Sequence, residues 1–269
     1  MLHKLAIGLV HQWYLVKGRL KSVILIYAVL MIFQLVQARL LLSTLMVFKS
    51  GTFTLGDAYL ASFGGFLNYD INSAVDQVSL GFYVALLILP SILLSSCLND
   101  RRISINQSYL IRLGSKRVWY GDRFILLLFI AAMLTLLKNL LVLLFTIMFH
   151  GDYLNTSLVL LDHLSSGSKD LSIPLMFMYD VGMQLFVLML ASILWLYLKE
   201  GVADLVLLVT VMILVIWQTT LSPLYLTSWI RATSSGTPWI SLTLMLILTF
   251  FVLVVLPKWT VSLEGWKDE

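Results

Sequence analysis

Long blocks of apolar residues set the first constraint on the fold of this chain. Six such blocks lie at residues 22–48, 78–98, 124–148, 174–198, 202–221 and 239–256. Each is close to the ~20 residues that an α-helix needs to cross about 30 Å of hydrocarbon, or longer. Only 12% of the residues are charged, against roughly 25% in a soluble domain, so a soluble fold is excluded. The sequence therefore predicts an all-α polytopic membrane protein with six transmembrane helices.

The first residues are expected to form a cytoplasmic amphipathic helix that lies on the membrane. Apolar residues recur there at helical spacing and form one stripe: Leu2, Leu5, Ala6, Leu9, Trp13, Val16 and Leu20. An apolar stripe with Trp and basic flanks is typical of an interfacial helix, and a frayed cytoplasmic tail is the alternative. The predicted organisation is an interfacial helix at 1–21, a transmembrane domain at 22–257 and a cytoplasmic tail at 258–269.

The distribution of Lys and Arg predicts the orientation of the spans. With the N-terminus inside, thirteen of these eighteen residues lie in inner segments, three in outer segments and two within spans. Basic loops stay on the cytoplasmic side, so both termini are expected in the cytoplasm. The outer segments are then residues 50–77, 150–173 and 223–237. Within the first of them, residues 59–66 are apolar enough to dip into the membrane interface.

Three charged residues lie deep within the predicted spans: Arg39, Lys138 and Asp180. At about 1.5 Å per residue they lie roughly 26, 21 and 27 Å from the inner surface, all in the outer half of the bilayer. Intramembrane charges are costly and are usually paired or turned toward water. We therefore predict that Asp180 pairs with Arg39 or Lys138. The alternative is that both cations snorkel separately to the outer headgroups.

The spans lack the side chains that catalysis needs. They contain no His and no Glu, and the chain has neither an HExxH motif nor a paired-carboxylate motif. A metal site outside the membrane could use His150, Asp152, Asp162 and His163, but their spacing is not specific. The single Cys97 excludes an internal disulfide. We predict no catalytic residue, no metal or cofactor in this chain and no nucleic-acid partner. Without a GxxxxGK[ST] motif, any ATP must be bound by another chain.

The stretch between the second and third spans, residues 99–123, holds six of the eighteen Lys and Arg residues. A short helix can be inferred within it, with Asn106 as N-cap and Gly114 as the stop. One interpretation is a basic loop that fixes orientation. The other is a docking helix for a cytoplasmic partner, with an apolar edge at Leu110 and Leu113.

The layout resembles the permease subunit of a type-2 ABC exporter. In that family a short coupling helix after the second span inserts into the ATPase. It has a leucine-rich turn, a Pro-Ser-Arg-like step and a Gly-Lys-like approach to the third span. The matching residues here are Leu110, Ile111 and Leu113, then Gly114, Ser115, Lys116 and Arg117, then Gly121, Asp122 and Arg123. Gly114 replaces the usual Pro, and Asn106 and Gln107 stand where an acidic residue is common.

The resemblance implies a cell-membrane protein of bacterial type that moves a hydrophobic or amphipathic substrate outward, such as an antimicrobial peptide or a drug. Its implied partners are cytoplasmic ABC ATPase subunits, which carry ATP and Mg²⁺, a second permease copy or related permease, and the lipid bilayer. The implied ATPase-coupling residues are Leu110, Arg112, Leu113, Ser115, Lys116 and Arg117. Export of a lipid-linked glycan and a non-transporting membrane scaffold are alternatives. An ion-driven transporter would need more intramembrane carboxylates.

Overall fold

The computed structural model describes residues 2–49, 51–63, 74–98, 116–157, 159–160, 173–198 and 200–216. Their helices are α1 (Leu2–Lys49), α2 (Leu55–Phe63), α3 (Ala74–Leu98), α5 (Lys116–Met148), α6 (Ile173–Tyr197) and α7 (Glu200–Ile216). Within this part of the chain the only β-structure consists of isolated bridge residues, such as the bridge between Thr54 and Asp152. The predicted all-α class is therefore confirmed for the described residues.

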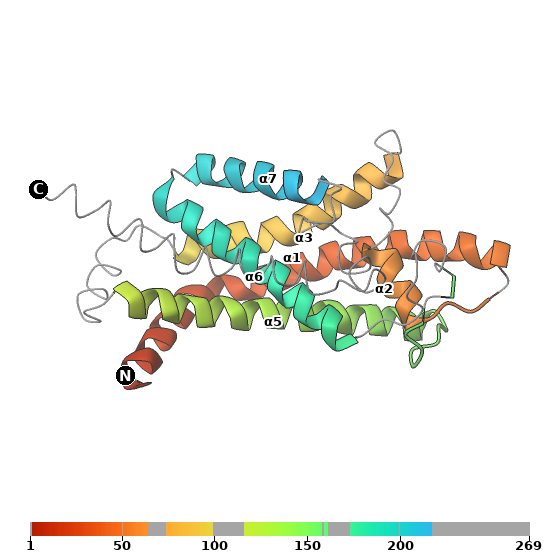
Figure 1. The fold of residues 1–269 in the computed structure, drawn as a ribbon, viewed down its shortest axis with the longest axis horizontal. Helices are drawn as coiled ribbons and strands as arrows, with labels where there is room; N and C mark the ends of the chain where they lie inside the picture. The colour runs from red at the N-terminus through yellow and green to blue at the C-terminus, as the bar shows by residue number, and fades with distance from the viewer. Residues whose placement is uncertain are drawn as a thin grey trace, which may run out of the picture.

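Four long helices pack in a closed ring, in which α1 contacts α3 and α5, and α6 contacts the same two helices from the other side. The helix α7 packs outside this ring against α6 and α3, while the short α2 lies against α1 and α5 (Figure 1). Burial explains this arrangement, because α1 presents one stripe at helical spacing to its neighbours. The stripe consists of Val16, Leu20, Val23, Tyr27, Met31, Leu35, Ala38 and Leu42.

The helix α1 differs from the expectation of a separate interfacial helix followed by a span from Ser22. It is a single helix of 48 residues, although its first turns lie at an angle to the rest (Figure 1). No proline interrupts this stretch, and its two glycines, Gly8 and Gly18, each cost only about 1 kcal/mol in a helix. Val16 and Leu20 from the predicted interfacial stripe are buried in the bundle, and the Trp13 ring meets Phe129 of α5 edge-on.

Two stretches of the described helices are long and apolar enough to cross a membrane: Val16–Thr44 in α1 and Asp122–Met148 in α5. Shorter apolar stretches lie in α3, α6 and α7, at Gly81–Ser95, Asp180–Trp195 and Gly201–Ile213. The six-span layout stays a prediction. The sixth block, 239–256, lies outside the described residues, as does the C-terminal tail.

The helix α5 begins earlier than expected. We predicted the third span from Phe124, and instead the helix runs unbroken from Lys116 to Met148. Asp122 and Arg123, which we placed in the basic cytoplasmic segment, are 0% and 2% exposed within it. Helix propensity explains the extension, because nothing between Lys116 and Phe124 breaks a helix except Gly121, which is tolerated.

Two segments that we predicted to lie outside the membrane are fastened to one another. We call residues 51–63 with residues 149–157, 159 and 160 the outer cap. Thr54 and Asp57 form a capping box at the start of α2: the Asp57 amide donates to Thr54 Oγ1 at 3.0 Å, and the Thr54 amide donates to Asp57 Oδ2 at 3.1 Å. The other carboxylate oxygen, Asp57 Oδ1, accepts from the amides of Val159 and Leu160 at 3.1 and 3.0 Å.

Close packing and a tight helix end complete the outer cap. A methyl group on Gly56 would lie 2.3 Å from the Thr156 carbonyl oxygen, so only glycine allows this approach. At the end of α5, His150 has a φ of 56°, and the Gly151 amide donates to the Thr146 carbonyl at 2.8 Å, which is the geometry of a Schellman C-cap. We expected residues 59–66 to dip into the lipid interface. Tyr59 and Ser62 are instead buried against protein.

Candidate functional site

In the interior of the bundle an ion pair joins Lys138 Nζ of α5 to Asp180 Oδ2 of α6. The two side chains are only 8% and 7% exposed. The Tyr59 hydroxyl of α2 donates to the same carboxylate oxygen, and Lys138 Nζ lies 5.0 Å from the centre of the Tyr59 ring. Three helices therefore meet at one carboxylate.

We call Lys138, Asp180 and Tyr59 the buried cluster. Its electrostatics explain why the three side chains stabilise one another. Removing two charges from water is expensive, and only their mutual attraction and further hydrogen bonds offset that cost. Tyr59 supplies such a bond. Burial, and then the neighbouring Asp180 charge, raises the pKa of the Tyr59 hydroxyl well above its ordinary value, so the hydroxyl remains a donor. The cluster carries no net formal charge and ties the outer cap to α5 and α6.

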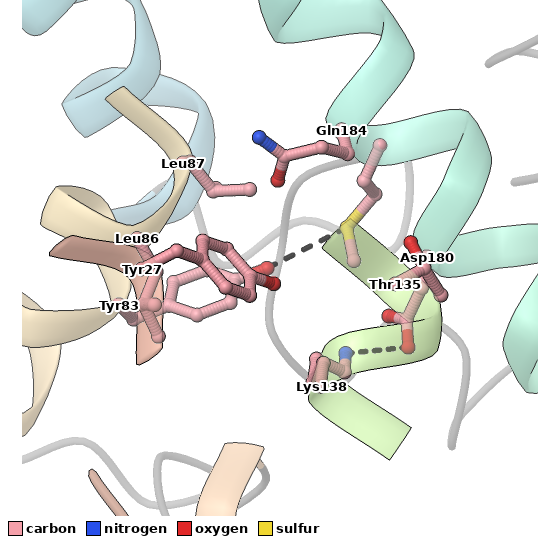
Figure 2. Close-up of a pocket in the computed structure, with 9 residues that line it drawn as sticks. Tyr27, Tyr83, Leu86, Leu87, Thr135, Lys138, Asp180 and Gln184 are labelled. Carbon is pink, nitrogen blue, oxygen red and sulfur yellow. Dashed lines mark hydrogen bonds and ion pairs between the residues drawn. The ribbon is translucent and has the colours of Figure 1, made fainter. Parts of the chain in front are cut away.

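A small cavity of about 20 Å³ lies beside the ion pair. Four helices line it: Tyr27 comes from α1, Tyr83, Leu86 and Leu87 from α3, Thr135 and Lys138 from α5, and Asp180, Met183 and Gln184 from α6. Figure 2 shows these side chains converging, with the two tyrosine rings opposite the ion pair. The Tyr83 hydroxyl donates to Met183 Sδ at 3.5 Å. The site is thus a small polar pocket with aromatic and aliphatic walls, with room for a group about the size of one water molecule.

Of the two cations proposed for Asp180, Lys138 forms the pair. Arg39 is elsewhere: its guanidinium lies 4.6 Å above the ring of Phe149, just past the C-terminal end of α5. Lys138 and Asp180 meet, as their similar predicted depths allow. Depth alone could not choose between the two cations, since the choice depends on which faces of α1 and α5 turn toward α6.

The predicted coupling residues fall largely outside the described residues. Leu110, Arg112, Leu113 and Ser115 are not described, whereas Lys116 and Arg117 form the first turn of α5. The ion pair is not brought together with this segment, because Lys138 lies 22 residues, or about 33 Å, further along the helix. Of the metal-site candidates, His150 and Asp152 are exposed in the outer cap, and Asp162 and His163 are not described.

Sequence reasoning missed Tyr59 and Gln184. Both are polar residues in apolar surroundings, at 3% and 4% exposed. A signal existed for Gln184, because it follows Asp180 by four residues and so lies on the same face of α6. No local signal marks Tyr59, whose partner lies 121 residues further along the chain.

Comparison with known proteins finds no match, whether to a family model, a curated protein or a solved structure.

Proposed function

We propose that this protein is the transmembrane permease subunit of an ATP-driven exporter of the ABC type, with six spans and both termini in the cytoplasm. The observation that carries the proposal is the continuity of α5. The helix begins within the basic segment, at Lys116, and extends without a break to Met148. A force applied by a cytoplasmic motor at its first turn therefore has a stiff route into the bundle.

The exposed surface of the long helices supports a location in the bilayer. On α1, Leu25, Val36 and Leu40 are 67%, 55% and 66% exposed, and Phe129 and Leu136 of α5 are 56% and 59% exposed. Continuous apolar faces of this kind are rare on soluble monomers and are normal where lipid is the solvent. The faces lie opposite the buried stripes, as lipid contact requires.

The buried site supports an apolar or amphipathic cargo rather than an ion. Asp180 is already paired with Lys138, so the pair offers no free charge to a transported ion. Tyr27, Tyr83 and Leu87 form a wall that suits apolar groups. In this proposal the partner ATPase supplies the energy, and the permease supplies the path.

The proposal is tested at the coupling segment. Leu110 and Leu113 would fill an apolar groove on the ATPase, and Arg112, Lys116 and Arg117 would meet its acidic rim. Buried apolar anchors carry most of the energy of an interface, whereas rim charges mainly tune its rate and salt dependence. The double variant Leu110→Asp with Leu113→Asp should therefore abolish co-purification of an ATPase subunit from native membranes, as identified by mass spectrometry.

Arg112→Ala is the matched control, because it leaves the apolar anchors in place. It should weaken ATPase recovery less, and mainly at raised salt. Membrane insertion should be normal in both variants, since the leucine variant keeps every basic residue that sets orientation. If the double leucine variant recovers the parent amount of ATPase and still supports export, residues 99–123 are only an orientation signal.

A further inference from the structure

The apolar face of α1 ends, toward the N-terminus, in two lysines. The face consists of exposed apolar residues at helical spacing: Leu25, Ile32, Val36 and Leu40. Continued toward the N-terminus at intervals of three or four residues, it passes through Lys21, Lys17 and Tyr14, all of which are exposed. The side of α1 that is turned away from the bundle therefore changes from apolar to basic within one turn, between Leu25 and Lys21.

The contacts of the two lysines leave their charges available to a ligand. Lys17 Nζ lies 3.8 Å from the centre of the Tyr14 ring, and an ammonium in such a contact keeps N–H donors for a further partner. Among the described residues no carboxylate pairs with Lys17 or Lys21, in contrast to Lys138. Two exposed positive charges without a neighbouring negative charge attract an anion to this end of the face.

The position of the lysines along α1 suits the headgroup layer of a membrane. Lys21 comes one turn, or about 6 Å, before Leu25, and Lys17 comes about 12 Å before it. Side chains on a helix lean toward its N-terminus, as the contact of Lys17 with Tyr14 shows, so the ammonium groups are directed away from the apolar face. Tyr14, which is 61% exposed, is of a residue type that is enriched where hydrocarbon meets water.

We propose that Lys17, Lys21 and Tyr14 form a binding site for the phosphate of an anionic phospholipid, whose acyl chains lie along the apolar face of α1. The Cβ atoms of residues four apart on a helix lie about 5–6 Å from each other, so both ammonium groups can reach one phosphate. The Tyr14 hydroxyl supplies a further donor. The adjacent apolar face favours a lipid over a free phosphate, because only the lipid covers it. The site rests on the membrane location in the proposed function and is independent of an ATPase.

Native mass spectrometry of the purified full-length protein in detergent tests the site, because it counts bound lipids. The probes are dioleoylphosphatidylglycerol, which is anionic, and dioleoylphosphatidylcholine, which has no net charge. The parent should bind the anionic lipid more tightly. Lys21→Gln should weaken that binding about five-fold, and Lys17→Gln with Lys21→Gln about thirty-fold. Binding of the zwitterionic lipid should not change in either variant.

Arg19→Gln is the matched control. It removes one charge from the same helix, and Arg19 is also exposed, but it is two residues from each lysine and so lies on a different side of α1. It should bind the anionic lipid like the parent. Equal weakening in Arg19→Gln and Lys21→Gln would overturn the proposal, because net charge alone would then explain the binding.

Two further results would also overturn the lipid site: equal affinity of the parent for the two lipids, and displacement of the anionic lipid by an equal concentration of glycerol phosphate. Melting temperatures without added lipid should match in all variants, because the replaced side chains are exposed. None of these measurements involves an ATPase, so failure of the lipid site is distinct from failure of the exporter proposal.

Discussion

The carboxylate of Asp57 accepts a hydrogen bond from the backbone amide of Leu160, 103 residues further along the chain. The same side chain also binds the Val159 amide and caps α2 through Thr54. One fully buried acidic residue thus closes two outer segments on each other. These hydrogen bonds to one side chain make Asp57 the central residue of the outer cap.

Replacing Asp57 should destabilise the outer cap more than replacing any exposed acidic residue. Hydrogen bonds to a charged group contribute roughly 1.5–3 kcal/mol each, so Asp57→Ala should lower the free energy of unfolding by roughly 3 kcal/mol or more. Thermal unfolding in detergent measures this, and protease cleavage within residues 149–157 should rise. Asp152→Ala is the control, because Asp152 is exposed and its carboxylate accepts one bond, from Leu154. An equal loss of stability in Asp57→Ala and Asp152→Ala would contradict the central role of Asp57 in the outer cap.

Replacing one partner of the ion pair should lower the free energy of unfolding more than replacing both partners with apolar residues. Asp180→Asn leaves the Lys138 charge buried and uncompensated, at a cost of about 3–5 kcal/mol. The apolar double variant Lys138→Met with Asp180→Leu should recover most of this loss, and the charge swap Lys138→Asp with Asp180→Lys should recover part of it. Melting temperatures in detergent compare the variants. If Asp180→Asn melts with the parent protein, the two charges do not depend on each other.

Gly56 and Gly81 should respond oppositely to alanine. The added methyl of Gly56→Ala would meet the backbone oxygen of Thr156 at 2.3 Å, so this variant should lose about 1–3 kcal/mol of stability. Nothing lies within 4 Å of the corresponding position at Gly81, which lies within α3. There the better helix propensity of alanine should add up to ~1 kcal/mol. Urea or thermal unfolding measures the stability of the two variants. If Gly56→Ala is as stable as the parent protein, Gly56 does not lie this close to the Thr156 backbone.

The orientation predicts which surface an impermeant thiol reagent reaches on intact cells. In a Cys97→Ser background, Leu154→Cys should react, because Leu154 is 82% exposed in the outer cap. Lys17→Cys at the other end of the bundle should react only after the membrane is permeabilised. Cysteines at Ser73, Ser166 and Ser234 should behave like Leu154→Cys, and one at Ser108 like Lys17→Cys. The reverse pattern would invert the topology.

The sequence predicted features that depend on periodicity, charge count and depth. Apolar blocks revealed the long helices, and the depth of Lys138 and Asp180 indicated that they could meet. It did not predict how far the helices extend, because α1 and α5 continue past the ends of their apolar blocks. Polar residues at 17–21 and 116–123 suggested a boundary, yet they are compatible with helix and no breaker stops the chain there.

The outer cap was harder to foresee for a physical reason. The Thr54–Asp57 capping box is visible in four consecutive residues, and a search for it would have placed the start of α2. The contacts from Asp57 to Val159 and from Tyr59 to Asp180 join residues more than 100 positions apart. Such pairs leave no local pattern. Gln34, whose Nε2 donates to the Ser62 carbonyl, was likewise visible only as an unexplained polar residue in a span.

The length of α1 makes the outer cap sensitive to its surroundings. The apolar stretch Val16–Thr44 is 29 residues, or about 43 Å, which exceeds the ~30 Å of an average hydrocarbon core. A helix that is too long for its bilayer tilts, and the tilt decreases as the bilayer thickens. Gln34 lies on this helix and holds α2 through Ser62, so a change in tilt shifts the anchor point of the outer cap. We therefore expect the packing of the outer cap against α1 to change with the thickness of the surrounding membrane.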